Sequence, residues 1–181
     1  MLNKKKALRK IIKVRVSAIS ADERRKREEI LHNNLFSMPE FLSASRVMLF
    51  ANLPDEIDTF SLIDKCFAMG KKVYLPVING DDMTVAEFTG EYQIGRYGIK
   101  EPSLLTPNSS LITPNSMDFA LVPGVGFSPS GYRLGRGKGY YDKFLSKQPE
   151  LFTVGVCFRE QFFLDIPRES HDVPMNKVLV I

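Results

Sequence analysis

The sequence predicts a three-layer α/β/α fold with a largely parallel, Rossmann-like central sheet. Two observations support this prediction: segments of helical spacing alternate with short strands, and those strands are apolar, as in parallel sheets. A third is size, because 181 residues with 44% hydrophobic content can form one globular domain with a sizeable core. No internal repeat or linker divides the chain, so we expect a single domain over residues 1–181.

Helical spacing or a helix-start signal marks four segments: residues 4–16, 20–36, 59–69 and 140–147. The second of these segments opens with Ser20 and Glu23 in the register of a capping box. Asp58 or Thr59 can cap the third segment, and Gly70 is its expected stop.

Apolar runs predict six strands: residues 46–51, 72–78, 83–88, 119–124, 152–158 and 177–181. The turn NGDD separates the second strand from the third. Residues 89–115 are rich in Gly, Pro, Ser and Thr, and we expect them to pass over the surface of the sheet.

Positive charge is concentrated at the N-terminus. Residues 1–27 hold 11 of the 25 lysines and arginines but two of the 21 acidic residues, so the remainder of the chain is net acidic. A basic segment can contact nucleic acid, anionic lipid or a phosphorylated ligand, although on charge alone a solvated helix face is the preferred interpretation. Because the remainder is acidic, and the glycine-rich loop described below does not spread its aromatic residues over a strand surface, we expect no nucleic-acid partner.

Other features predict a soluble, cytoplasmic protein. No apolar run approaches the roughly 18 residues that a membrane helix needs, and no secretory h-region follows the first lysines. Cys66 and Cys157 are expected to be free, buried thiols. His32 and His171 cannot build a zinc site alone, and no obligate protein partner is evident.

The main functional signal is a glycine-rich loop, GYRLGRGKGYYDKF, at residues 131–144. Six of the twelve glycines lie between Gly124 and Gly139. The loop follows a predicted strand and precedes a predicted helix, which is where open α/β sheets bind ligands. Its pattern is neither a P-loop nor the dinucleotide-binding G-x-G-x-x-G, so both of those sites are disfavoured.

Interleaved glycines and cations favour a polyphosphate ligand. The glycines would present backbone N–H groups and the cations would neutralise charge. These residues are Gly135, Gly137 and Gly139 together with Arg133, Arg136 and Lys138. Asp142 lies one helical turn further on, where its carboxylate can hold Mg²⁺ against the phosphates. The alternative is a glycine-rich surface turn with solvated cations and an acid favoured by the helix dipole.

The string PGVGFSPSGYRLGRGKGYYDKFL resembles the signature of the 5-formyltetrahydrofolate cyclo-ligases, also called methenyltetrahydrofolate synthetases. The segments KKALR, DEIDT and ESHDVPMNKVL are similar to segments of the same family, in the same order. The resemblance implies ATP- and Mg²⁺-dependent conversion of 5-formyltetrahydrofolate, with or without a polyglutamate tail, to 5,10-methenyltetrahydrofolate. The formyl oxygen is phosphorylated, the ring closes, and ADP and phosphate are released. The alternative is another small-molecule kinase or ATP-dependent transferase that uses the same loop.

The resemblance also implies roles for individual residues. Nucleotide contacts are implied for Lys5, Arg9, Arg133, Gly135, Arg136, Gly137, Lys138, Gly139, Tyr140, Tyr141 and Asp142. Folate contacts are implied for Ala51, Glu56, Arg136, Gly137, Lys138, Gly139 and Tyr140, so Arg136 and Lys138 are the catalytic candidates. Metal contacts are implied for Asp142 and Asp172. The chain departs from the family pattern at Ser128 and Asn176, where members often carry Asp.

Glu56 has a separate argument from its position. Asp55, Glu56 and Asp58 follow the first predicted strand, at the sheet edge where the glycine-rich loop also begins. A carboxylate there can accept hydrogen bonds from the amino and ring N–H groups of a pterin. With the resemblance, we assign the ligand role to Glu56 and the helix-capping role to Asp58, and leave Asp55 unassigned.

Overall fold

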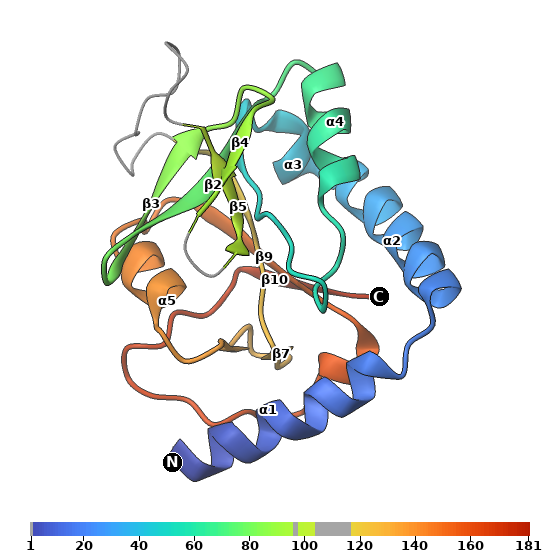
Figure 1. Ribbon diagram of the computed structural model, residues 1–181, viewed down its shortest axis with the longest axis vertical. Coiled ribbons are helices and arrows are strands. Elements are labelled where there is room, and N and C mark those ends of the chain that lie inside the picture. The colour runs from blue at the N-terminus through green and yellow to red at the C-terminus, as the bar shows by residue number, and fades with distance from the viewer. Residues whose placement is uncertain (1, 96–97, 104–116) are drawn as a thin grey trace.

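The computed structural model describes residues 2–95, 98–103 and 117–181, which are arranged around one six-stranded sheet (Figure 1). The strand order is β10–β9–β6–β1–β2–β3. The strands are β1 (Arg46–Met48), β2 (Lys72–Asn79), β3 (Asp82–Glu87), β6 (Phe119–Val122), β9 (Phe152–Cys157) and β10 (Lys177–Val180). Neighbouring strands are parallel except for the antiparallel pair β2–β3. The predicted α/β fold with a largely parallel sheet is therefore confirmed.

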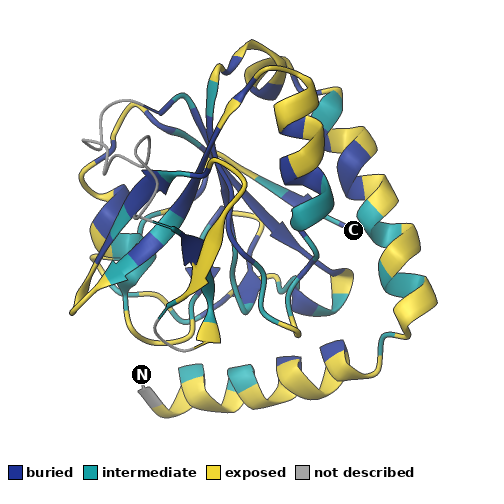
Figure 2. Cartoon of the chain, turned by 45° about the horizontal axis from the view of Figure 1, so that its top comes forward, coloured by how far each residue is buried: buried dark blue, intermediate teal, exposed yellow. Residues whose placement is uncertain are grey.

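Helices cover both faces of this sheet. They are α1 (Leu2–Ser17), α2 (Ala21–Phe36), α3 (Pro39–Ser43), α4 (Phe60–Ala68), α5 (Tyr140–Leu145) and the 3₁₀ turn η3 (Arg159–Gln161). Side chains of successive strand residues enter different apolar clusters: Val47 packs with the helices α2 to α4, and Met48 packs with α5. In Figure 2 the strands at the centre of the sheet are mostly dark blue, and the helices around them have yellow outer sides. Apolar strands are thus buried on both sides, as their composition predicts.

The helix-start signals act much as expected. Ser20 Oγ accepts a hydrogen bond from the backbone N–H of Glu23 at 3.2 Å. At α4, Asp58 Oδ1 accepts one from Phe60 N at 3.0 Å, whereas the Thr59 hydroxyl donates to the carbonyl of Phe50. Asp58 is therefore the residue that caps this helix with its side chain.

Several short elements add to the predicted set. They are α3, the antiparallel pair β4 (Tyr92–Ile94) and β5 (Lys100–Pro102), and the antiparallel pair β7 (Gly126–Phe127) and β8 (Arg133–Leu134). The expected surface path of residues 89–115 agrees with β4, whose residues are exposed. It is wrong for β5, because Glu101 and Pro102 are buried. Residues 104–115 of that prediction lie outside the described residues.

Both cysteines are buried free thiols, as predicted. Burial raises the pKa of Cys66 to about 11 and that of Cys157 to about 12. Among the helices that the structure describes, none combines the length and the apolar character that crossing a membrane requires.

The sheet has a topological switch point next to β1. From β1 the chain passes through α4 to β2 on one side, whereas β6 lies on the other side and leads through α5 to β9. Loops that leave the carboxyl ends of β1 and β6 consequently diverge and leave a crevice where ligands bind in folds of this kind. The acidic segment after β1 and the glycine-rich loop after β6 meet at this crevice.

Candidate functional site

The glycine-rich loop lies between two cavities at the carboxyl edge of the sheet. The first, here called the apolar cavity, has a volume of about 370 Å³, and the second, the cationic cavity, about 940 Å³. Residues that line both cavities are Arg133, Gly135, Arg136, Lys138, Gly139 and Asp142. A single short segment can therefore contact a ligand in each cavity at the same time.

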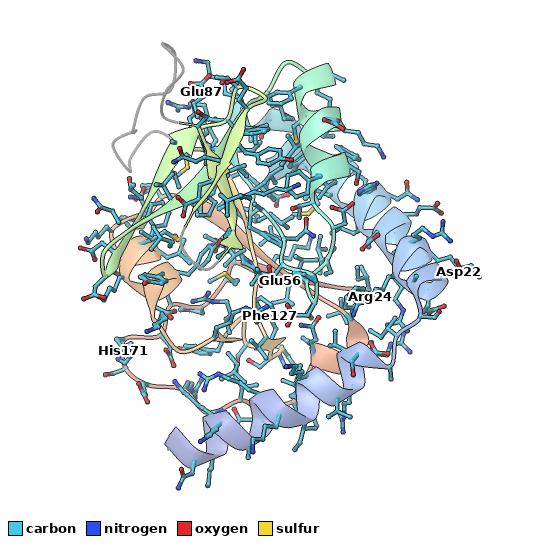
Figure 3. All side chains as sticks on the ribbon, viewed as in Figure 1. Asp22, Arg24, Glu56, Glu87, Phe127 and His171 are labelled. Atoms are coloured by element: carbon cyan, nitrogen blue, oxygen red, sulfur yellow. The ribbon has the colours of Figure 1, made fainter. Side chains whose placement is uncertain are left out.

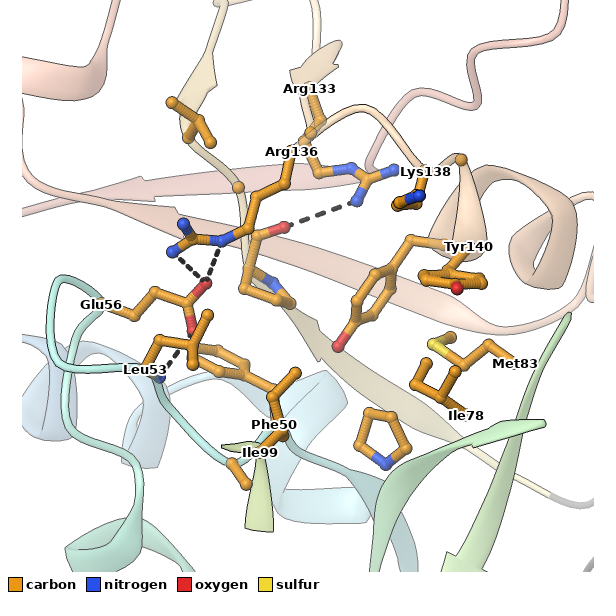
Figure 4. Close-up of a pocket in the computed structure, with 18 of the residues that line it drawn as sticks. Phe50, Leu53, Glu56, Ile78, Met83, Ile99, Arg133, Arg136, Lys138 and Tyr140 are labelled. Atoms are coloured by element: carbon orange, nitrogen blue, oxygen red, sulfur yellow. Dashed lines mark hydrogen bonds and ion pairs between the residues drawn. The ribbon is translucent and has the colours of Figure 1, made fainter. Parts of the chain in front are cut away.

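The apolar cavity has walls from both halves of the sheet (Figure 4). Its remaining lining residues are Phe50, Ala51, Leu53, Glu56, Pro76, Ile78, Met83, Ile99, Glu101, Pro123, Gly124, Val125, Tyr140 and Tyr141. Four residues predicted for the site are among them: Ala51, Glu56, Tyr140 and Tyr141. Tyr141, which the resemblance places on the nucleotide alone, lines this cavity and not the cationic one, and so does Tyr140, which the resemblance places on both substrates.

Glu56 is bonded through both of its carboxylate oxygens. Oε1 accepts hydrogen bonds from Arg136 Nη2 at 3.0 Å and Nε at 3.3 Å, and Oε2 accepts one from Leu53 N at 2.9 Å (Figure 4). Asp55, unassigned from the sequence, accepts a further bond from Arg136 Nη2 at 2.7 Å. Burial opposes the charge of Arg136, but its bonds to Asp55 and Glu56 outweigh that effect and raise its pKa. Arg136 thereby ties the glycine-rich loop to the segment after β1.

Arg133 and Asp142 form a buried ion pair. Arg133 Nη2 lies 2.9 Å from Asp142 Oδ1, and the two side chains are 3% and 12% exposed. The guanidinium also lies over the ring of Tyr141, 5.2 Å from its centroid. Burial and the nearby charge of Glu56 raise the pKa of Tyr141 above its ordinary value, so its phenol stays protonated at neutral pH. Arg133 thus neutralises a carboxylate of the chain itself, a pairing that was not predicted from the sequence.

Helix α1 forms one wall of the cationic cavity. Lys5 Nζ donates to Asp172 Oδ2 at 3.1 Å, and Arg9 Nε donates to the carbonyl oxygen of Gly135 at 2.8 Å. Both residues line the cavity, as does Gly137. His171, on the same segment as Asp172, also lines this cavity and lies at the edge of the molecule (Figure 3). The basic N-terminal segment is therefore docked on the glycine-rich loop, and the residues predicted at positions 5 and 9 face the same cavity.

Comparison with known proteins assigns the family. The model of the 5-formyltetrahydrofolate cyclo-ligase family matches residues 1–181. The chain belongs to the 5-formyltetrahydrofolate cyclo-ligase family. The family predicted from the glycine-rich string is therefore confirmed, and the chain is an enzyme of the ligase class.

Three relatives of this cyclo-ligase family member have low sequence identity but match almost its full length. A 5-formyltetrahydrofolate cyclo-ligase from Mus musculus is 28% identical, over 97% of this chain and 92% of the mouse protein. A probable 5-formyltetrahydrofolate cyclo-ligase from Caenorhabditis elegans is 30% identical, over 97% of this chain and 91% of that protein. The NMR structure of Aquifex aeolicus 5,10-methenyltetrahydrofolate synthetase has 32% identity and a TM-score of 0.85, and it covers 97% of this chain and 89% of its own.

The two carboxylates predicted to bind Mg²⁺ in this cyclo-ligase family member each make their described hydrogen bonds through one oxygen. The described contacts of Asp142 fall on Oδ1, which also accepts a bond from Val173 N at 3.3 Å. Asp172 Oδ2 accepts bonds from Lys5 Nζ and from Glu169 N at 2.7 Å, and its Oδ1 lies 3.8 Å from His171 Nε2. Among the described residues no cluster of three or more His, Cys, Asp or Glu side chains could hold a metal ion. A cation bound by Asp142 would therefore take its other ligands from phosphates and water, as Mg²⁺ commonly does.

The two departures from the family pattern have structural partners. Asn176 Oδ1 accepts bonds from Thr153 N and Oγ1, each at 2.8 Å, so it fastens the closing segment to β9. Ser128 Oγ lies 3.0 Å from Ser130 Oγ in the turn between β7 and β8. Neither residue lines the two cavities.

Proposed function

We propose that this enzyme uses ATP and Mg²⁺ to convert 5-formyltetrahydrofolate to 5,10-methenyltetrahydrofolate, with release of ADP and phosphate. The family supports the folate substrate. The use of ATP and Mg²⁺ is supported by a different observation: the glycine-rich loop lines both the apolar and the cationic cavity. A flat pterin suits the apolar cavity, and a nucleotide polyphosphate suits the cationic one. A phosphoryl group held beside the loop would then lie next to the folate.

The proposed reaction requires the folate and the γ-phosphate of ATP to lie next to each other. The formyl group of the substrate is an amide, and its carbon is a poor electrophile. Its oxygen attacks the γ-phosphorus of ATP, and the bond from that phosphorus to the β–γ bridging oxygen breaks, which releases ADP. The second folate nitrogen then attacks the activated carbon and loses its proton, while the carbon–oxygen bond breaks and phosphate leaves. Phosphoryl transfer of this kind depends mainly on positioning and on stabilisation of charge.

Each part of the site has a proposed role in this reaction. Arg136 and Lys138 line both cavities, so their cationic groups can stabilise the transferred phosphoryl group. Gly135, Gly137 and Gly139 would offer backbone N–H groups to the phosphates. When it is bound, Mg²⁺ neutralises charge on the phosphate oxygens, and Asp142 is the residue that would hold it.

The direct test is an assay of the purified protein with ATP, Mg²⁺ and 5-formyltetrahydrofolate. The methenyl chromophore is expected to grow, with one ADP formed for each methenyl product, and neither substrate should react without the other. ADP formation at the same rate without folate, or transfer to an unrelated acceptor, would instead favour a kinase or transferase that shares the loop.

Arg9→Met is expected to raise the KM for ATP about tenfold and to change the KM for the folate less than twofold. Loss of one charge-assisted contact costs about 1.5–3 kcal/mol, and Arg9 lines only the cationic cavity. Steady-state kinetics with each substrate varied in turn measure both constants. Lys10→Met is the matched control, because Lys10 is the next residue of α1 and is exposed. Equal losses for both substrates in Arg9→Met would show that α1 supports the fold and not the nucleotide.

A further inference from the structure

Glu101 of β5 is an acidic residue among those that line the apolar cavity. The residue is 4% exposed, and its neighbours in the wall include the apolar side chains of Ile78, Met83 and Ile99. Burying a carboxylate among such side chains is costly unless hydrogen bonds or an opposite charge compensate.

The chain supplies one part of that compensation. Glu101 Oε1 accepts a hydrogen bond from the backbone N–H of Ile78 at 3.2 Å. No further hydrogen bond or ion pair reaches this side chain from the residues that the structure describes. A carboxylate can accept about four hydrogen bonds, so Glu101 keeps acceptor sites for a molecule in the cavity.

Gly95 leaves room for this carboxylate, because it has no side chain. A Cβ atom at residue 95 would lie 2.2 Å from Cδ of Glu101, and 2.3 Å and 2.6 Å from its two oxygens. Gly95 is not among the described glycines with positive φ, so its backbone alone does not demand glycine. The missing side chain at residue 95 is thus explained by the close approach of Glu101.

We propose that Glu101 is a specificity-determining residue of the apolar cavity, whose carboxylate accepts hydrogen bonds from the ring N–H and the amino group of the substrate's pterin. The inference rests on the proposed function, because that function supplies the pterin. The two donors are neighbours on one edge of the ring, and together they match the two oxygens of a carboxylate.

This assignment changes the role expected of Glu56. Both oxygens of Glu56 already accept bonds within the chain, from Arg136 and from Leu53. Glu56 therefore has fewer acceptor sites left for the pterin than Glu101 has, and it also orients Arg136.

Glu101→Gln tests the proposal, because glutamine keeps the size of the side chain but turns an N–H₂ group toward the donors of the pterin. The dissociation constant of 5-formyltetrahydrofolate, measured by calorimetry without ATP, is expected to rise about tenfold to a hundredfold. The KM for ATP and the melting temperature should stay close to those of the wild type. Glu87→Gln is the control: Glu87 bonds to Tyr74 and lies at the opposite end of the molecule from α1 (Figure 3). The Glu87→Gln enzyme should bind the folate as tightly as the wild type does.

Two further measurements separate recognition from a structural role. Gly95→Ala should weaken folate binding in the same selective way, because the new Cβ displaces the carboxylate of Glu101. An analogue of 5-formyltetrahydrofolate with a methyl group in place of the pterin amino group should bind the wild type at least about tenfold more weakly than the substrate. Glu101→Gln should discriminate between the two molecules much less.

The outcomes distinguish this inference from the proposed function. If the wild type forms the methenyl product and Glu101→Gln binds the folate as tightly as the wild type, the role of Glu101 is wrong and the function stands. The role of Glu101 would also be wrong if Glu101→Gln weakened ATP and folate binding equally, or if this variant discriminated against the analogue as strongly as the wild type. A wild-type enzyme that neither binds nor converts 5-formyltetrahydrofolate would overturn both.

Discussion

Asp142→Asn is expected to raise the Mg²⁺ concentration for half-maximal turnover at least about tenfold, because a hard cation needs the full charge of a carboxylate. It should also lower the free energy of unfolding by about 3 kcal/mol, since it removes the counter-charge of a buried guanidinium. That guanidinium belongs to Arg133, whose side chain is 3% exposed. A Mg²⁺ titration of turnover and urea unfolding measure the two effects separately.

Asp172→Asn is the matched control, because Asp172 lines the same cavity and its side chain is 9% exposed, against 12% for Asp142. Its bond to Lys5 is lost, but its effect on the Mg²⁺ requirement should be the smaller of the two. If Asp142→Asn loses stability and keeps the Mg²⁺ dependence of the wild type, Asp142 serves only as the partner of Arg133.

Gly137→Ala is expected to raise the dissociation constant of ATP about tenfold or more while the fold stays intact. Gly137 has φ +108°, a backbone conformation that costs other residues about 1–3 kcal/mol. Space is not the obstacle, because the new Cβ would meet Arg9 at an ordinary 3.5 Å. The loop would therefore relax to another conformation and move the N–H groups proposed to hold the phosphates. Calorimetric titration with ATP measures the loss.

Gly135→Ala distinguishes two possible causes of weaker ATP binding: a change in the backbone conformation of the loop, and loss of close packing of the phosphates against it. Gly135 is not among the positive-φ glycines, and a Cβ there would meet nothing within 4 Å. A loss of ATP affinity in Gly137→Ala alone shows that the backbone conformation matters. A loss in both variants shows that the phosphates pack directly against the loop. Wild-type affinity in a folded Gly137→Ala would contradict the role of the loop backbone.

Local patterns made much of the fold predictable. Apolar strands indicated a parallel sheet, and the signals at Ser20 and Gly70 marked helix ends because capping involves residues a few positions apart. The glycine-rich loop was predictable because glycines and cations adjoin there in sequence. The ion pair of Arg133 with Asp142 could not be predicted from these local patterns. In the sequence, each residue alone suggests a ligand contact: the guanidinium with phosphate and the carboxylate with Mg²⁺.

The walls of the apolar cavity could not be predicted, because they come from long-range packing. Ile78 and Met83 have the composition of ordinary strand residues, and they reach the site only because β2 and β3 pair beside β1. Glu101 belongs to a Gly- and Pro-rich stretch that suggested a surface path, and no local signal marks its burial.

The sharing of one loop by two cavities also limits how the substrate preference of this enzyme can change. A substitution at Arg136 or Lys138 alters the surroundings of both ligands, so adaptation to one substrate is coupled to the other. Positions that line a single cavity escape this coupling, such as Met83 and Ile99 on one side and Ser146 on the other. Sequence drift among related enzymes, and directed evolution toward altered folates, should therefore proceed through these unshared walls while the loop stays constant.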